Sequence, residues 1–136
     1  MDLTSAMAIA AAGMKVQSAR LRVTAENLAN AESTARVPGG DPFRRKTVVF
    51  ASRRDREAGI ELVDVRRYGV DPTDFELRHQ PGHPGADADG YVKYPNVNPL
   101  VELADMREAQ RSYEANLNLI TATRRMIART LDILRV

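Results

Sequence analysis

The chain has 136 residues, with 20 Lys and Arg against 18 Asp and Glu, so its formal charge is +2. This length suits one small domain. The absence of cysteine excludes a disulfide framework, a thiolate zinc site and a cysteine nucleophile. Acidic and basic residues alternate along the chain, whereas a nucleic-acid surface needs concentrated positive charge, so we expect no nucleic-acid partner.

Residues 2 to about 31 are predicted to form a helix with apolar residues on two sides. One series recurs every seven residues, at Met7, Met14, Leu21 and Leu28. A second series lies about two positions further on, which is ~200° around the helix, at Ile9, Val16 and Val23. A helix on the surface of a monomer needs only one apolar stripe. We therefore expect the first series to pair with another helix and the second to face a neighbouring subunit.

The apolar run at residues 6–12 could be taken for the centre of a signal peptide. Only Asp2 precedes it as a charged residue, so the basic leader of such peptides is missing. The run is also shorter than the ~20 residues that a membrane-spanning helix needs. We expect no cleaved signal peptide and no membrane span.

The region from Pro99 to the C-terminus contains no glycine and no second proline, which predicts a long helix that Asn98 could cap. Its large apolar residues follow the seven-residue repeat of a coiled coil. They are predicted to form the helix-pairing and assembly interface together with the first N-terminal series, and they are Leu103, Met106, Tyr113, Leu117, Ile120, Ile127, Leu131 and Leu134.

The middle of the chain, residues 32–98, holds seven of the eight glycines and six of the seven prolines. Residues 46–51 and 60–68 are rich in β-branched and aromatic side chains and predict an antiparallel pair. Residues 80–90 predict an extended loop that leads into a short strand at 91–94. The expected fold is mainly α: a discontinuous helical core of residues 1–31 and 99–136, paired as a coiled coil, carries a small outer β-hairpin and loop domain of residues 32–98.

Candidate chemistry is sparse. His79 and His83 lie near Asp87 and Asp89, but the prolines and glycines between them prevent the helix that would bring the two imidazoles onto one face. No nucleophile elbow, phosphate-binding loop or dinucleotide fingerprint occurs. We expect no metal site, no cofactor and no enzymatic activity.

Four segments in order along the chain resemble the flagellar rod and hook axial protein family. RLRVTAENLANA at residues 20–31 and ELADMREAQRSYEAN at 102–116 are similar to the N- and C-terminal signatures of the whole family. PFRRK at 42–46 is a further matching segment, and PGHPGADADGYVKYPNVN at 81–98 narrows the resemblance to the proximal rod proteins of the basal body. The residues of the family-specific loop are Pro81, Gly82, His83, Pro84, Asp87, Gly90, Tyr91, Pro95 and Asn96.

The resemblance implies a structural subunit of the periplasmic rod of the bacterial flagellum. Members of this family pair their terminal helices around a hollow, torque-transmitting shaft that motility requires. The implied partners are other rod proteins, the adaptor between the rod and the membrane ring, copies of the same chain and the flagellar type III export apparatus. The alternative is a soluble coiled-coil adaptor or export chaperone, which would form a small discrete oligomer instead of a polymer.

Overall fold

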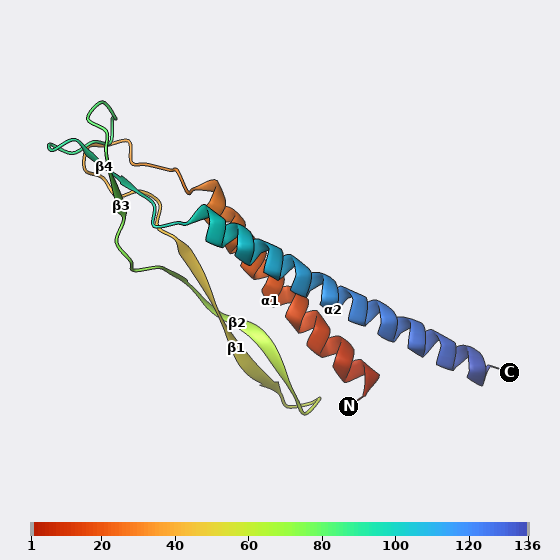
Figure 1. Ribbon diagram of the computed structural model, residues 1–136. Coiled ribbons are helices and arrows are strands. Elements are labelled where there is room, and N and C mark those ends of the chain that lie inside the picture. The colour runs from red at the N-terminus through yellow and green to blue at the C-terminus, as the bar shows by residue number, and fades with distance from the viewer. Residues whose placement is uncertain (1, 136) are drawn as a thin grey trace.

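Two long helices dominate the computed structural model, which describes residues 2–135. Helix α1 spans Leu3–Ala29 and helix α2 spans Pro99–Leu134. They lie side by side and antiparallel (Figure 1), with the rest of the chain at one end and along one side. The prediction of a mainly α fold with long paired terminal helices and a small β insert is confirmed.

The start of α2 is determined by a side-chain cap and a proline in the first turn. The side-chain oxygen of Asn98 accepts hydrogen bonds from the amides of Leu100 at 3.0 Å and Val101 at 3.4 Å. Pro99 occupies the first turn, where its missing N–H costs nothing. The predicted cap is therefore confirmed, and it fixes where the chain turns from the middle segment into α2.

The middle segment forms two separate two-stranded antiparallel sheets. Strands β1 (Lys46–Asp55) and β2 (Ile60–Val70) pair as predicted, although both run further than the sequence suggested. Their register shifts once, between Val49 and Phe50. Gly59 closes the turn at a φ of +66°, a conformation that glycine adopts without strain. This hairpin lies along α1 (Figure 1).

The second sheet pairs β3 (Glu76–His79) with β4 (Tyr91–Tyr94). Strand β4 was predicted at these bounds, whereas β3 was not predicted. Leu77 is the one large apolar residue of β3, so the strand carries no alternating apolar pattern. Its pairing with β4 depends on the hydrogen bond from the Gln80 amide to the Gly90 carbonyl at 2.8 Å, which closes the loop between them.

Small and polar side chains form the seam where α1 and α2 meet. On α2 the buried positions are Glu102, Ala109 and Thr123, which are seven and fourteen residues apart. Gly13 of α1 lies against Asn116, so close that a Cβ added to Gly13 would be 2.9 Å from the Asn116 amide nitrogen. The helices therefore approach closely, and the large apolar residues lie beside the seam instead of in it.

The two helices differ in length, and α2 projects beyond α1. Asn27 contacts Glu102, and Gly13, fourteen residues earlier, contacts Asn116, fourteen residues later. Continuing this antiparallel register places Leu3 opposite Met126. About eight residues of α2, from 127 to 134, therefore extend past the start of α1 (Figure 1).

We predict that Gly13→Leu will destabilise the chain by roughly 1–3 kcal/mol, because a larger side chain forces the helices apart at their closest approach. The matched control is Ala11→Leu, two residues away on an exposed position of α1, which should change stability by less than about 0.5 kcal/mol. Denaturant unfolding followed by circular dichroism measures both. Equal stability of the two variants would contradict close helix contact at Gly13.

Candidate functional site

A buried carboxylate joins the three main parts of the fold. Glu102, in the first turns of α2, is 1% exposed. Its Oε1 accepts a hydrogen bond from Arg45 Nε at 2.6 Å, and its Oε2 accepts one from Asn27 Nδ2 at 3.2 Å. An isolated charge would be very costly to bury here, so both oxygens need these partners. We call Glu102, Arg45 and Asn27 the junction.

Asn27 also fastens the hairpin to α1. Its Oδ1 accepts a hydrogen bond from the Lys46 amide at 2.8 Å, and its Nδ2 donates to the Lys46 carbonyl at 2.9 Å. The side-chain amide therefore pairs with the first residue of β1 much as a neighbouring strand would. One asparagine thus fixes where the hairpin begins relative to both helices.

Arg45 extends the junction toward the second sheet. Its amide donates to Asn96 Oδ1 at 2.8 Å, and its guanidinium lies 3.5 Å from Asp71 Oδ2. Hydrogen bonds from the backbone and side chain of Thr73 lower the pKa of Asp71, with Arg45 adding to the effect. Partial burial lowers the pKa of Arg45, but the hydrogen bond and the charge of Glu102 outweigh it and raise that pKa above its usual value. Both shifts favour the charged forms of Asp71 and Arg45.

Exposed ion pairs add further links between the elements. Arg20 of α1 lies 3.1 Å from Asp105 and 3.4 Å from Glu108 of α2. Lys15 of α1 bonds Asp64 of β2 at 3.0 Å, and that bond is the main cause of a lowered pKa at Asp64. Pairs of this kind in water contribute little each. They orient the surfaces of the helices more than they hold them together.

The structure corrects the expected role of two residues of the second N-terminal series. Val16 and Val23 are 2% and 6% exposed within the single chain, so neither can present a surface to a neighbouring subunit. The hairpin packs along this side of α1 and explains why the helix needs a second apolar stripe. Ile9, about two turns beyond Val16, stays 37% exposed and remains available for a neighbour.

The first N-terminal series and half of the α2 series lie at the edge of the helix pair. These residues are half-buried, and helical phase places both rows on the side of the pair opposite the hairpin. The α1 row lies one position after the seam on that helix, as Met14 follows Gly13, and the α2 row lies four positions after the seam, as Met106 follows Glu102. The half-buried residues are Met7, Met14, Leu21, Leu28, Met106, Tyr113, Ile120 and Ile127.

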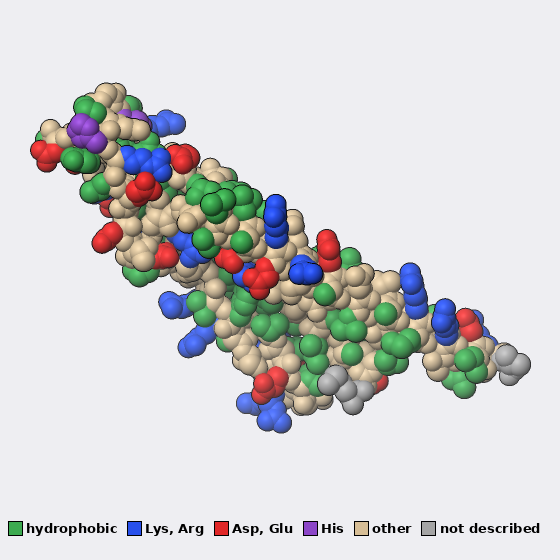
Figure 2. Space-filling model, viewed as in Figure 1, with side chains coloured by type: hydrophobic (Ala, Val, Ile, Leu, Met, Phe, Trp, Pro, Cys, Tyr) green, Lys and Arg blue, Asp and Glu red, His purple; other side chains and the backbone are tan. Residues whose placement is uncertain are grey.

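The remaining predicted α2 residues take little part in pairing within the chain. Leu103, Leu117 and Leu131 are 41%, 45% and 56% exposed. They are spaced fourteen residues apart, which is two heptads, and we call them the leucine stripe. Hydrophobic side chains along the helix pair are visible at the surface (Figure 2). Exposed Gln110 and Arg124 lie between these leucines in the same series, so the stripe is a row of separate apolar side chains. Large apolar residues left exposed on one helix face mark an interaction surface. Further exposed apolar residues of α2 are Leu100, Val101, Leu119, Met126, Ile133 and Leu134.

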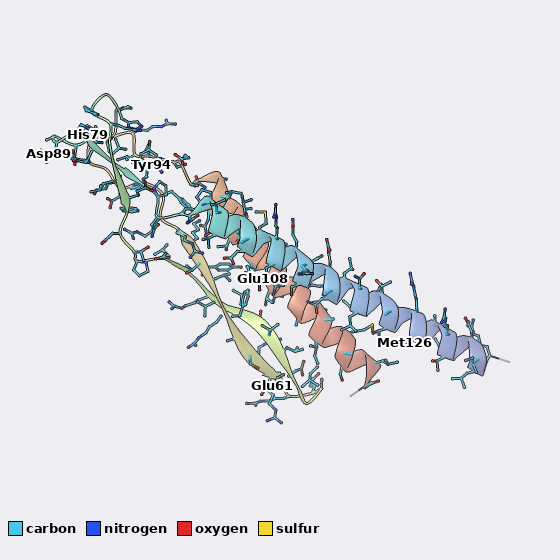
Figure 3. The ribbon with its side chains drawn as sticks, viewed as in Figure 1. Glu61, His79, Asp89, Tyr94, Glu108 and Met126 are labelled. Carbon is cyan, nitrogen blue, oxygen red and sulfur yellow. The ribbon has the colours of Figure 1, made fainter. Side chains whose placement is uncertain are left out.

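The family-specific loop is a hydrogen-bonded unit at the end of the molecule away from the free end of α2. Asp87 Oδ1 accepts from the amides of Asp89 at 3.0 Å and Tyr91 at 2.8 Å. The Tyr94 hydroxyl donates to Gln80 Oε1 at 3.0 Å. Pro95 is buried beneath this unit, whereas Pro81, Gly82 and Pro84 are exposed. His79, Asp89 and Tyr94 mark this end in Figure 3.

The apolar repeats and turn residues of the sequence did not predict the junction. Asn27 and Glu102 lie in the two family signatures, but an apolar repeat draws attention to leucine and methionine. The available signal was a second seven-residue series on α2, at Glu102, Ala109, Asn116 and Thr123, made of small and polar residues. Across residues 2–135, no cluster of three or more His, Asp or Glu is placed to hold a metal ion. No helix in that range has the length and hydropathy to cross a membrane.

Comparison with protein families identifies the class. Residues 88–133 match the model described as the flagellar basal body rod FlgEFG protein C-terminal region. This match covers the end of the family-specific loop and most of α2, the helix that carries both Glu102 and the leucine stripe. The match points to the structural proteins of the flagellar rod and hook as the class, and the long C-terminal helix agrees with it.

Curated relatives narrow the class further. The chain is 54% identical to the flagellar basal-body rod protein FlgC of Agrobacterium fabrum, over 98% of this chain and 96% of that protein. It is 41% identical to FlgC of Aquifex aeolicus, over 97% of each chain, and 38% identical to FlgC of Escherichia coli O6:H1, over 98% of each. The chain therefore belongs to the FlgC family of flagellar basal-body rod proteins.

We predict that Glu102→Ala will destabilise the chain by roughly 3–5 kcal/mol, because the partly buried Arg45 loses its 2.6 Å partner and keeps only Asp71 at 3.5 Å. The matched control is Glu108→Ala on the same helix, whose exposed side chain should contribute less than about 0.5 kcal/mol. Urea denaturation of the two purified variants measures the difference. A loss at Glu102 no larger than the loss at Glu108 would show that the junction does not hold the fold.

Proposed function

We propose that this chain is a subunit of the proximal rod and that it polymerises through its terminal helices into a hollow, torque-transmitting shaft. The observation that carries the proposal is the leucine stripe, which the chain leaves exposed along a helix of 36 residues. A chain that worked alone would expose polar residues there. The family of rod proteins to which it belongs agrees with this role.

Division of labour within the chain supports the proposal. The discontinuous helical unit, residues 1–31 and 99–136, forms the axial core, and residues 32–98 supply the outer part with the family-specific loop. The junction ties the hairpin to both helices, so a lateral force on the hairpin reaches the core through hydrogen bonds and packed side chains. Close packing resists such shear because displacement would open voids and remove dispersion contacts.

The assembly surface has two parts in this proposal. The leucine stripe and the half-buried rows lie on the side opposite the hairpin, and Leu134, on the projecting end of α2, extends this side beyond the start of α1. Ile9 lies about 200° around α1 from the half-buried row of that helix and forms the second, smaller part of the surface. Other rod proteins, the adaptor to the membrane ring and copies of this chain are the partners. The subunit reaches the periplasmic rod through the flagellar type III export apparatus and without a cleaved signal peptide.

We predict that Leu117→Asp will prevent incorporation of the chain into the rod and abolish swimming. Leu117 is exposed, so the isolated variant should keep the helical content and stability of the parent within about 0.5 kcal/mol. In an assembled interface the same charge would be buried without a partner. Swimming in soft agar, recovery of the chain in purified basal bodies and circular dichroism of the isolated chain measure these outcomes.

The matched control is Asn118→Asp, which adds the same charge at an exposed polar residue one position along α2 and a different helical face. It should swim and assemble normally. Normal swimming of the Leu117→Asp variant would show that the leucine stripe is not part of the interface. A wild-type chain that forms a small closed oligomer and is absent from purified basal bodies would favour the soluble adaptor instead.

A further inference from the structure

His83 connects the family-specific loop to the chain that follows α1. Its Nδ1 lies 2.9 Å from the Gly85 amide nitrogen, within the loop itself. Its Nε2 lies 3.2 Å from Thr34 Oγ1, on the segment of residues 31–40. The half-buried ring therefore bonds in both directions, once to hold the shape of the loop and once to attach it.

The contact with Gly85 determines the protonation of the ring. A backbone N–H can only donate, so Nδ1 must accept and carries no proton. The neutral ring then has its proton on Nε2, which donates to Thr34 Oγ1. Both bonds are satisfied by this one neutral tautomer. In the doubly protonated ring, an N–H at Nδ1 would face the N–H of Gly85.

The loop and the segment of residues 31–40 are in backbone contact beside His83. A Cβ on Gly85 would clash with the Ala35 carbonyl oxygen, so the two backbones pass directly against each other. The Gly39 amide donates to the Gly85 carbonyl at 3.3 Å. Loss of the His83 bond to Gly85 would therefore act at the point where the loop and the segment of residues 31–40 fit most tightly.

The charged groups around His83 have other partners or face solvent. On the loop, the Asp87 carboxylate accepts two backbone amides, and Asp89 is exposed. On the segment after α1, Glu32 pairs with Arg78 and Arg36 is exposed. Asp41 pairs with Lys93 of β4 at 2.8 Å. Within residues 2–135, no carboxylate is hydrogen-bonded to the ring to favour its charged form.

We propose that His83 is a pH-sensitive latch on the family-specific loop. In its neutral form the ring fastens the loop to the segment of residues 31–40, and in its protonated form it releases the loop. Since only the neutral ring makes both bonds, the closed loop is favoured while the ring is neutral, and protonation of the ring at lower pH opposes it. The latch is independent of the proposed role of the chain as a subunit of the rod.

The test is an NMR titration of the full chain from about pH 7.5 to about pH 5. Two-bond ¹H–¹⁵N correlations at the higher pH should show His83 protonated on Nε2. The hydrogen-exchange protection factor of the Gly85 amide, corrected for the intrinsic pH dependence of exchange, should fall about tenfold or more over the titration. A proton on Nδ1 at high pH, or constant Gly85 protection, would overturn the proposal.

The chain has two histidines, so a matched control is available. His83→Gln should leave Gly85 poorly protected and independent of pH. His79→Gln should retain the wild-type titration, because His79 contacts the Tyr91 ring, at 5.0 Å between centroids, instead of the Gly85 amide. Thr34→Val removes only the Nε2 bond and should keep the pH dependence. The same pH dependence in His83→Gln as in wild type would also overturn the latch.

Discussion

The rest of the fold depends on the burial of the Glu102 carboxylate where α1, α2 and the hairpin meet. Such a charge is tolerated only in one arrangement, because Arg45 and Asn27 must both reach it. The ion pair therefore adds more to the choice of register than to the net free energy of folding. A slip of the helices by one turn, ~5.4 Å, would leave the carboxylate without partners, and the hairpin would lose its anchor on Asn27. Apolar packing alone would discriminate poorly, since small side chains line the seam.

The sequence was sufficient to predict both helices, their pairing and strands β1, β2 and β4, because periodicity, capping and turn residues are local signals. Which face of each helix forms the seam was not predictable in the same way. Large apolar residues at seven-residue spacing usually mark a seam, but here Gly13 and Ala109 mark it, and the larger side chains lie beside it. Sequence spacing identifies which residues share a face, whereas which face meets the partner depends on how closely the backbones approach.

The second stripe on α1 shows a similar limit. Its period correctly indicated that this side of the helix is covered. The sequence alone does not show whether a neighbouring subunit or the chain's own hairpin covers it. Val16 and Val23 proved to be covered from within, because the junction places β1 beside α1. The polar residues of the junction carry no periodic apolar signal, so their convergence from positions 27, 45 and 102 became visible only in three dimensions.

The unequal lengths of the helices imply a gradient of local stability along the isolated chain. Where α1 and α2 run together, opening a turn breaks tertiary contacts as well as backbone hydrogen bonds. Beyond Met126, α2 has no antiparallel partner, and an unsupported helical end of about two turns is marginal in water. The free energy of local opening should therefore fall steadily toward the C-terminus. Amide exchange would be slowest near Glu102, which lies in the network that joins three elements, and fastest around Ile133.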